Sequence, residues 1–177
     1  MPTTPRHVTV NVILDPTSHP PSFKLETDLP RGKGNNEIMF YNEHHPGLHV
    51  HYTLKDPAYG YVFPDAPIDN YLDEALWSTS DARCPTSEGQ WEQFTAHSIE
   101  DSGKTLVVYN LNENVQQFGY ALRVTKDGGK HYWNLDPIGG NQNGSYAARD
   151  LSGYAVAAVA GAVAGSLATL GFQALMS

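Results

Sequence analysis

Short runs in which apolar and polar side chains alternate are the feature that most constrains the fold of this chain. Apolar side chains occupy every second position of residues 8–14, and they do so again in residues 48–54 and 118–124. A period of two places one face of the segment in a core and the other in solvent, which predicts β-strands. The motif Asp127-Gly128-Gly129 predicts a hairpin turn after the third run.

Further segments are β-prone without such strict alternation. With 16 Gly, 12 Pro and 10 Tyr in 177 residues, the composition suits a turn-rich β domain. We expect short strands over residues 8–14, 23–25, 38–41, 48–54, 59–63, 105–111, 118–124 and 131–135. We expect residues 65–92 to form a long irregular connection with a helical turn near 71–76, and Gly139–Gly144 to form a linker. The fold class is therefore mainly β, an antiparallel immunoglobulin-like sandwich over residues 1–146.

The C-terminal segment differs from the rest of the chain. All 30 charged residues precede Leu151, and residues 151–177 contain no Asp, Glu, Lys, Arg or His. As a helix, residues 154–172 would span roughly 28 Å, close to the bilayer core of about 30 Å. We expect residues 147–177 to be a linker and one transmembrane helix, although seven Ala and three Gly in residues 154–172 weaken its hydrophobicity. A helix docked on the sandwich is the soluble alternative.

Two faces are predicted on that helix. Small side chains recur every fourth residue and predict a helix-packing face: Gly153, Ala157, Gly161, Gly165 and Thr169. Bulkier side chains fall on the opposite side and predict a lipid-facing surface: Val156, Val159, Val163, Leu167 and Leu170. The pattern favours close approach to neighbouring transmembrane helices.

The net charge and the N-terminal sequence restrict the classes of partner and the location that we expect for this protein. Eleven Lys and Arg against 19 Asp and Glu give a net charge of −8, which argues against a nucleic-acid binder. The first residues show no apolar signal-peptide core. We therefore expect a single-pass, C-terminally anchored membrane protein with its main domain in the cytoplasm, and with the lipid bilayer and integral membrane subunits as partners.

Histidines make the densest polar cluster of the body. His44, His45, His49 and His51 lie close together, with Glu43 beside them. His49 and His51 are two residues apart, so on a strand they face the same side and could ligate a metal. A polar strand face near a loop is the alternative. Cys84 lacks a nearby His or Met, so a blue-copper site is not expected, and a single cysteine excludes an intramolecular disulfide.

Several segments carry a family resemblance. The stretch FGYALRVTKDGGKHYWNLDPIGGNQNG, with IMFYNEHHPGLHVHYTL, CPTSEGQWEQF and LVVYNLNEN upstream, resembles the small bacterial DP-EP family and the similar inclusion-body β-sandwich proteins. The resemblance covers about residues 8–146 and implies a β-sandwich without established chemistry. It transfers no catalytic residues, and the hydrophobic tail departs from it.

These observations predict a non-enzymatic accessory subunit of a multi-subunit bacterial membrane complex, by analogy with small single-span subunits of energy-transducing and photosynthetic assemblies. The alternative is a ligand- or metal-binding module that uses the His44–His51 region, and a third reading is a self-assembling membrane protein. Asp65, Asp69 and Asp73 would share a face of a helix and, with Glu74 beside them, could form a calcium or acid/base group, but Pro67 disturbs the helix and solvated carboxylates are the simpler interpretation. No cofactor is indicated.

Overall fold

The computed structural model describes the chain in eight ranges. They are residues 5–19, 21–32, 36–40, 47–64, 75–85, 91–114, 116–126 and 128–141. The chain divides into two units, Met1–Ser145 and Tyr146–Ser177. All described residues belong to the first unit, and the description below concerns that unit alone.

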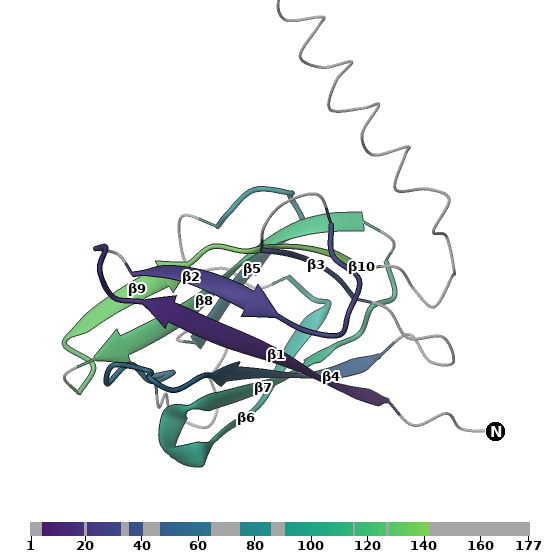
Figure 1. The fold of residues 1–177 in the computed structure, drawn as a ribbon. Coiled ribbons are helices and arrows are strands. Elements are labelled where there is room, and N and C mark those ends of the chain that lie inside the picture. The colour runs from purple at the N-terminus through teal and green to yellow at the C-terminus, as the bar shows by residue number, and fades with distance from the viewer. Residues whose placement is uncertain are drawn as a thin grey trace, which may run out of the picture. The chain divides into compact units, whose positions relative to one another are not determined.

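Strands dominate the described ranges, and the expectation of a mainly-β fold is confirmed (Figure 1). In chain order they are β1 (Arg6–Asp15), β2 (Ser22–Glu26), β3 (Glu37–Phe40), β4 (Leu48–Leu54), β5 (Leu76–Thr79), β6 (Phe94–Glu100), β7 (Thr105–Asn110), β8 (Gln116–Lys126), β9 (His131–Leu135) and β10 (Ile138–Asn141). One 3₁₀ turn, η1 (Asp101–Gly103), joins β6 to β7.

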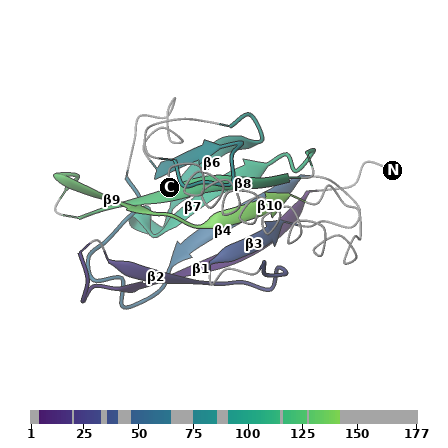
Figure 2. The ribbon, with the colours of Figure 1, turned by 90° about the horizontal axis from the view of Figure 1, so that it is seen from above.

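The strands form two sheets, which Figures 1 and 2 show from two directions. The first sheet has the order β2-β1-β4-β7-β6, and the second has β3-β10-β8-β5 with β9 also paired to β8. Two pairs are parallel, β1 with β4 and β3 with β10, so the prediction of an antiparallel arrangement is wrong for them. The hairpin partner β2 occupies one edge of β1, and β4 reaches the other edge after the chain has passed through β3 in the second sheet.

One hydrophobic core joins the inner faces of the two sheets. Aromatic rings from both sheets meet there: the Phe40 ring of β3 lies edge-on to Phe94 of β6, with 6.3 Å between centroids. Tyr52 of β4 and Tyr120 of β8 are likewise 6.0 Å apart, and both are fully buried. The alternating burial along β4 leaves its even-numbered residues inside and its odd-numbered residues, His49 among them, outside.

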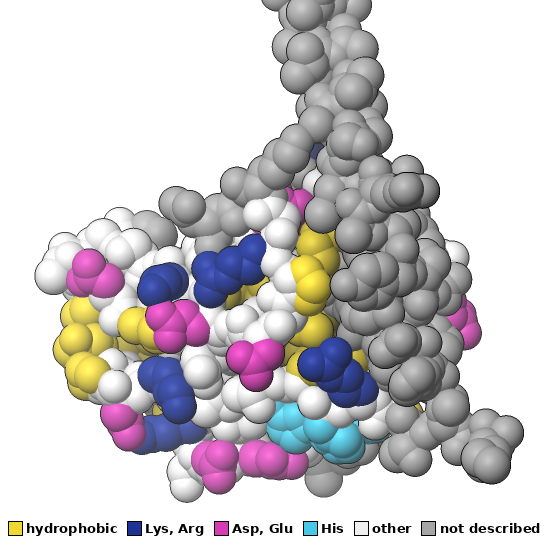
Figure 3. All heavy atoms as spheres, turned by 45° about the vertical axis from the view of Figure 1, so that its right-hand side comes forward, with side chains coloured by type: hydrophobic (Ala, Val, Ile, Leu, Met, Phe, Trp, Pro, Cys, Tyr) yellow, Lys and Arg dark blue, Asp and Glu magenta, His cyan; other side chains and the backbone are white. Residues whose placement is uncertain are grey.

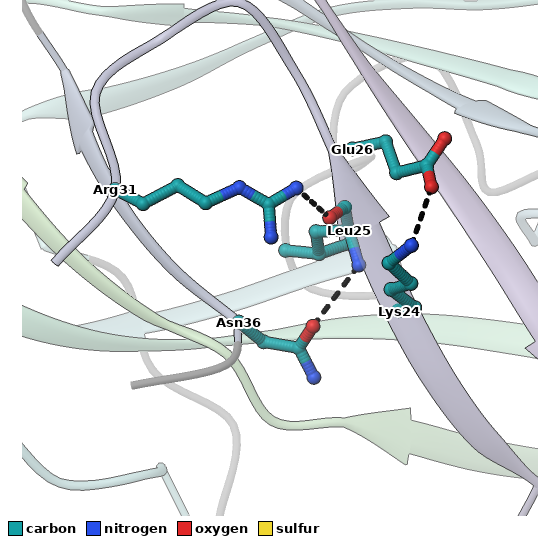
Figure 4. Close-up of polar contacts among 5 residues, drawn as sticks. All are labelled: Lys24, Leu25, Glu26, Arg31 and Asn36. Atoms are coloured by element: carbon teal, nitrogen blue, oxygen red, sulfur yellow. Dashed lines mark hydrogen bonds and ion pairs between the residues drawn. The ribbon is translucent and has the colours of Figure 1, made fainter. Parts of the chain in front are cut away.

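The β2 edge of the first sheet is held by the segment that leads into β3 (Figure 4). The Asn36 side chain accepts a hydrogen bond from the Leu25 amide at 3.0 Å and donates one to the Phe23 carbonyl at 3.2 Å. Arg31 donates to the Leu25 carbonyl at 2.6 Å. A side-chain amide thus replaces a neighbouring strand at this edge, where backbone groups would otherwise lack partners.

Several predicted boundaries are wrong. Residues 59–63 do not form a strand, and only Val62 makes an isolated bridge, to Thr125. Strands β5 and β6 were not predicted. The predicted linker at Gly139–Gly144 begins instead as β10, which pairs with both β3 and β8. Gly139 and Gly140 suit that position because a Cβ atom there would collide with the Phe118 ring and with the Met39 side chain.

Other predictions fall on residues that the structure does not describe. They are the helical turn near 71–76, apart from Ala75 and Leu76, and the whole C-terminal segment with its packing and lipid-facing residues. Among the described residues, no helix has the length and apolar character needed to cross a membrane. The tail predictions stay predictions.

Candidate histidine site

The outer face of the first sheet carries a cluster of imidazole rings. In β4, His49 and His51 alternate with Leu48, Val50 and Tyr52, all of which are completely buried. The two histidines therefore project from the same outer face, as their spacing predicted. His44 and His45, the other members of the predicted cluster, lie outside the described residues.

A third histidine joins them from the N-terminal strand. Because β1 and β4 are parallel with His7 opposite His49 and Thr9 opposite His51, His7 lies beside both β4 histidines. Its side chain is exposed, whereas those of His49 and His51 are half-buried. Figure 3 shows histidine side chains gathered in one patch of the surface, bordered by basic and acidic residues. We call His7, His49 and His51 the histidine cluster.

Two ring nitrogens of the histidine cluster approach each other closely. His7 Nδ1 and His51 Nε2 are 3.0 Å apart, a hydrogen-bond distance whose donor depends on the tautomers of the two rings. Two nitrogens bound to one metal at about 2.0–2.1 Å would be about 2.8–3.4 Å apart for angles between square-planar and tetrahedral. The observed separation falls within that range, so loss of the shared proton would leave two ring nitrogens spaced to bind one ion.

The ring planes decide which nitrogens can share an ion. The rings of His7 and His49 stack with centroids 4.7 Å apart and an angle of 12° between planes. Nitrogen lone pairs lie in the ring plane, so the lone pairs of two stacked rings run side by side and do not converge. The rings of His7 and His51 are 5.3 Å apart and tilted by 40°, so their planes intersect. His7 and His51 are thus the pair whose ring nitrogens come within hydrogen-bond distance of each other without stacked rings.

The histidine cluster is not a complete metal cage. Within the described part of the chain, no group of three or more His, Cys, Asp or Glu side chains is arranged to hold a metal ion. The contact of His7 Nδ1 with His51 Nε2 supplies two candidate ligands, fewer than a structural metal site uses. His49 Nδ1 is shielded from solvent, which leaves that atom turned away from the open side.

Aromatic packing supports the histidine cluster from the neighbouring strand. His49 pairs with Tyr109 of β7, and the two rings lie 5.0 Å apart. The row His7–His49–Tyr109 thus crosses three adjacent strands. Gly47 makes room for the Tyr109 ring, because a Cβ at that position would overlap the tyrosine hydroxyl. This row packs the His49 ring against the ring of His7, the residue that faces His51.

The other candidate residues do not make a comparable site. Cys84 is half-buried, its Sγ donates to the Asp136 carbonyl at 3.5 Å, and burial, with the nearby Asp136 carboxylate, raises the pKa of its thiol. The carboxylates Asp65, Asp69, Asp73 and Glu74 lie outside the described residues. Trp91 is buried in the core, whereas Trp77 is half-buried with the Arg123 guanidinium 4.3 Å from its ring centroid.

His7 is the functional candidate that sequence reasoning missed. It lies more than 40 residues from His49 in the chain, and alternation identifies which face a residue occupies but not which strand lies beside it. The shared pattern of polar, outward positions in residues 7–11 and 49–53 was the only available signal.

Comparison of the sequence with models of known protein families and with curated proteins finds no match. The resemblance to the DP-EP family therefore stays a prediction.

Proposed function

We propose that this protein is a non-enzymatic binding module that takes up a divalent transition-metal ion on the outer face of its first sheet. The 3.0 Å approach of His7 Nδ1 to His51 Nε2 is the observation that carries the proposal. Imidazole nitrogen is a favoured ligand of zinc, copper and nickel. The aromatic row behind His7 holds the ring in place before an ion arrives, which lowers the cost of binding.

The experiment is a metal titration of the full chain, purified without a histidine tag and stripped with a chelator. Zinc, nickel and copper(II) salts are added separately and followed by isothermal titration calorimetry. At least one of these ions should bind saturably at one ion per chain. The triple variant His7→Ala/His49→Ala/His51→Ala should lose that binding, while the control His19→Ala/His131→Ala, which changes two exposed histidines, keeps it. Equal binding by the triple variant would defeat the proposal.

A second candidate function comes from the sequence of the tail. We propose that the 27 residues from Leu151 to Ser177, which contain no charged residue or histidine, anchor the protein in a membrane as an accessory subunit of a larger complex. In this function the β domain contacts extramembrane surfaces of the partner subunits. The tail's small-residue face (Gly153, Ala157, Gly161, Gly165 and Thr169) packs between their transmembrane helices.

Carbonate extraction of native membranes tests the second candidate. The protein should stay in the membrane fraction and migrate in a large detergent-solubilised assembly. Gly161→Leu/Gly165→Leu should release it from that assembly without changing the far-ultraviolet circular dichroism of the β domain. Complete extraction by carbonate would eliminate the anchor.

A further inference from the structure

We infer that one end of the β domain is a docking surface for an acidic segment of a partner protein, with Tyr59 and Tyr132 as its anchors. The surface comprises the exposed parts of residues 55–61, 123–126 and 128–132, and we call it the hairpin end. Figure 1 shows the hairpin of β8 and β9 at one end of the two sheets. The inference goes beyond both candidate functions, because it needs neither a metal ion nor the C-terminal tail.

Two tyrosine rings reach solvent at the hairpin end. Tyr59 is 44% exposed and Tyr132 is 42% exposed, and in the part of the chain that the structure describes they are the large hydrophobic side chains with the greatest exposure. Thr125 of β8 pairs with Tyr132 on one side and exchanges two backbone hydrogen bonds with Val62 on the other. Two strand spacings, about 10 Å, therefore separate Val62 from Tyr132, so one partner of ordinary interface size can cover both rings.

The backbone at Tyr59 is strained. The Tyr61 amide donates to the Ala58 carbonyl at 2.9 Å, closing a four-residue turn whose central residues, Tyr59 and Gly60, have φ angles of 54° and 80°. Positive φ at both central positions is the type I′ pattern, which Asn-Gly satisfies best. A bulky side chain in this conformation is rare and costly, and such outliers cluster at functional sites. The exposed ring contributes little to the core, so we attribute the tyrosine to binding.

Ring contacts hold the hairpin end in one arrangement. The Tyr61 ring meets the Trp133 ring edge-on, with 5.2 Å between centroids, and Lys126 Nζ lies 5.3 Å from the centroid of Tyr61. The guanidinium carbon of Arg123 lies 4.6 Å from the centroid of the Tyr132 ring and restrains it. A surface that is ordered before binding loses less conformational entropy when a partner arrives.

Composition and charge indicate the kind of partner. Tyr and Arg are enriched at the energetic centres of protein–protein interfaces, and the hairpin end carries both. Residues 55–61 and 123–132 contain four basic and two acidic side chains, a net charge of +2 in a chain of net charge −8. Lys55 and Lys130 are exposed, and the acidic Asp56 pairs with Lys104 at 2.7 Å. Since opposite charge favours association, the matching segment is acidic.

The test starts by selecting phage-displayed short random peptides on the full chain. The enriched peptides should be acidic and should contain an aromatic or aliphatic side chain. Fluorescence anisotropy then measures the binding of the most enriched peptide to purified variants. Tyr59→Asn and Tyr132→Ser should each weaken its binding by at least about tenfold.

A matched pair of charge reversals tests the electrostatic part. Lys55→Glu/Lys130→Glu should weaken peptide binding by at least about fivefold at low salt, and the difference from wild type should shrink at high salt. The control Arg6→Glu/Arg83→Glu makes the same change in net charge at exposed positions outside the hairpin end. It should bind within about twofold of wild type, because distant surface charges are screened.

The thermal stability of Tyr59→Asn separates binding from folding. Asn adopts a positive φ more readily than Tyr, so this variant should unfold at a higher temperature than wild type while it binds the peptide more weakly. A lower unfolding temperature together with weaker binding would make Tyr59 a structural residue and overturn its role as an anchor.

Three further results would overturn the inference. The first is that no peptide is enriched, and the second is that both tyrosine variants bind the enriched peptides as tightly as wild type does. The third is that heparin, an acidic polysaccharide, binds the hairpin end while acidic peptides do not, which would assign the surface to a glycan. None of these results bears on metal binding or on carbonate extraction, so failure of this inference is distinguishable from failure of either candidate function.

Discussion

His7 and His49 face each other across the parallel pairing of β1 and β4, and their imidazole rings stack with centroids 4.7 Å apart. The contact joins the first strand of the chain to a central strand of the sheet on its solvent side. Cross-strand ring pairs of this kind contribute to the stability of a sheet as well as to the order of the rings.

The first prediction concerns this stack. His49→Ala should lower the free energy of unfolding by roughly 0.5–1 kcal/mol, because it removes ring contacts with both His7 and Tyr109. His49→Phe, which preserves a flat ring, should stay within about 0.3 kcal/mol of wild type. Urea denaturation at neutral pH measures both changes. Equal losses in the two variants would show that ring stacking is not what His49 contributes.

The second prediction concerns the buried tyrosines. Tyr52 and Tyr120 are completely buried, and among the described residues their hydroxyls meet each other without forming a hydrogen bond in good geometry. Replacing either with Phe removes a desolvated hydroxyl and leaves the ring in place. Tyr52→Phe and Tyr120→Phe should therefore match or exceed the stability of wild type, within about 1 kcal/mol in urea denaturation at pH 7. A loss of about 2 kcal/mol would mean that the hydroxyls make a strong interaction.

The third prediction is the behaviour of these tyrosines in alkali. Burial raises the pKa of both Tyr52 and Tyr120 above the ordinary tyrosine value, so the folded protein retains protons that the unfolded chain releases. Their stabilising contribution is complete below about pH 10 and is lost as the pH rises further, by up to about 1.4 kcal/mol per unit for each group. Urea denaturation at pH 8 to 11 should show a smaller decline for the double Phe variant. Parallel curves would contradict the shifted ionisation.

The fourth prediction concerns Gly119 in β8. A Cβ atom there would overlap the backbone carbonyl of Arg83 and lie 3.1 Å from the carbonyl oxygen of Asp81. Backbone cannot move aside as a flexible side chain can, so Gly119→Ala should cost about 2 kcal/mol or more. Gly128→Ala is the control: it meets nothing within 4 Å, but its φ of +69° should cost about 1 kcal/mol. Thermal unfolding that ranks Gly128→Ala as the more harmful would contradict the overlap.

The fifth prediction concerns the Asn36 side chain. Asn36→Ala removes both hydrogen bonds to β2 and should cost about 1–2 kcal/mol. Asn36→Asp keeps an acceptor for the Leu25 amide but loses the donor to the Phe23 carbonyl, so its cost should be intermediate. Hydrogen exchange of the Leu25 amide should accelerate in the Ala variant. Unchanged protection would show that another group holds this edge.

The predictability of the fold depended on how each strand is buried. Strands β1 and β4 were predictable because one face of each is continuously apolar. Strand β6 was not, since a register shift between Ala96 and Ser98 interrupts the alternation. Strand β10 resembles a linker because its glycines are required by close packing rather than by a turn.

The candidate site was only half visible in the sequence. The spacing of His49 and His51 predicted their common face. His7, which meets His51, comes from a strand that pairs in parallel with β4. The order of strands in a sheet cannot be read from the local alternation of apolar and polar residues. Long-range pairing is what brought His7 to the cluster.

The parallel pairing of β3 with β10 also determines when β3 can find its partner strand during synthesis. All four residues of β3, Glu37–Phe40, are buried in the finished protein, yet the strand beside it ends at Asn141. On the ribosome, this segment, apolar except for Glu37, is made early, and about a hundred more residues are added before its neighbour exists. During that interval it is an exposed target for chaperones and for wrong partners, so slowing translation between the two strands should raise aggregation rather than help folding.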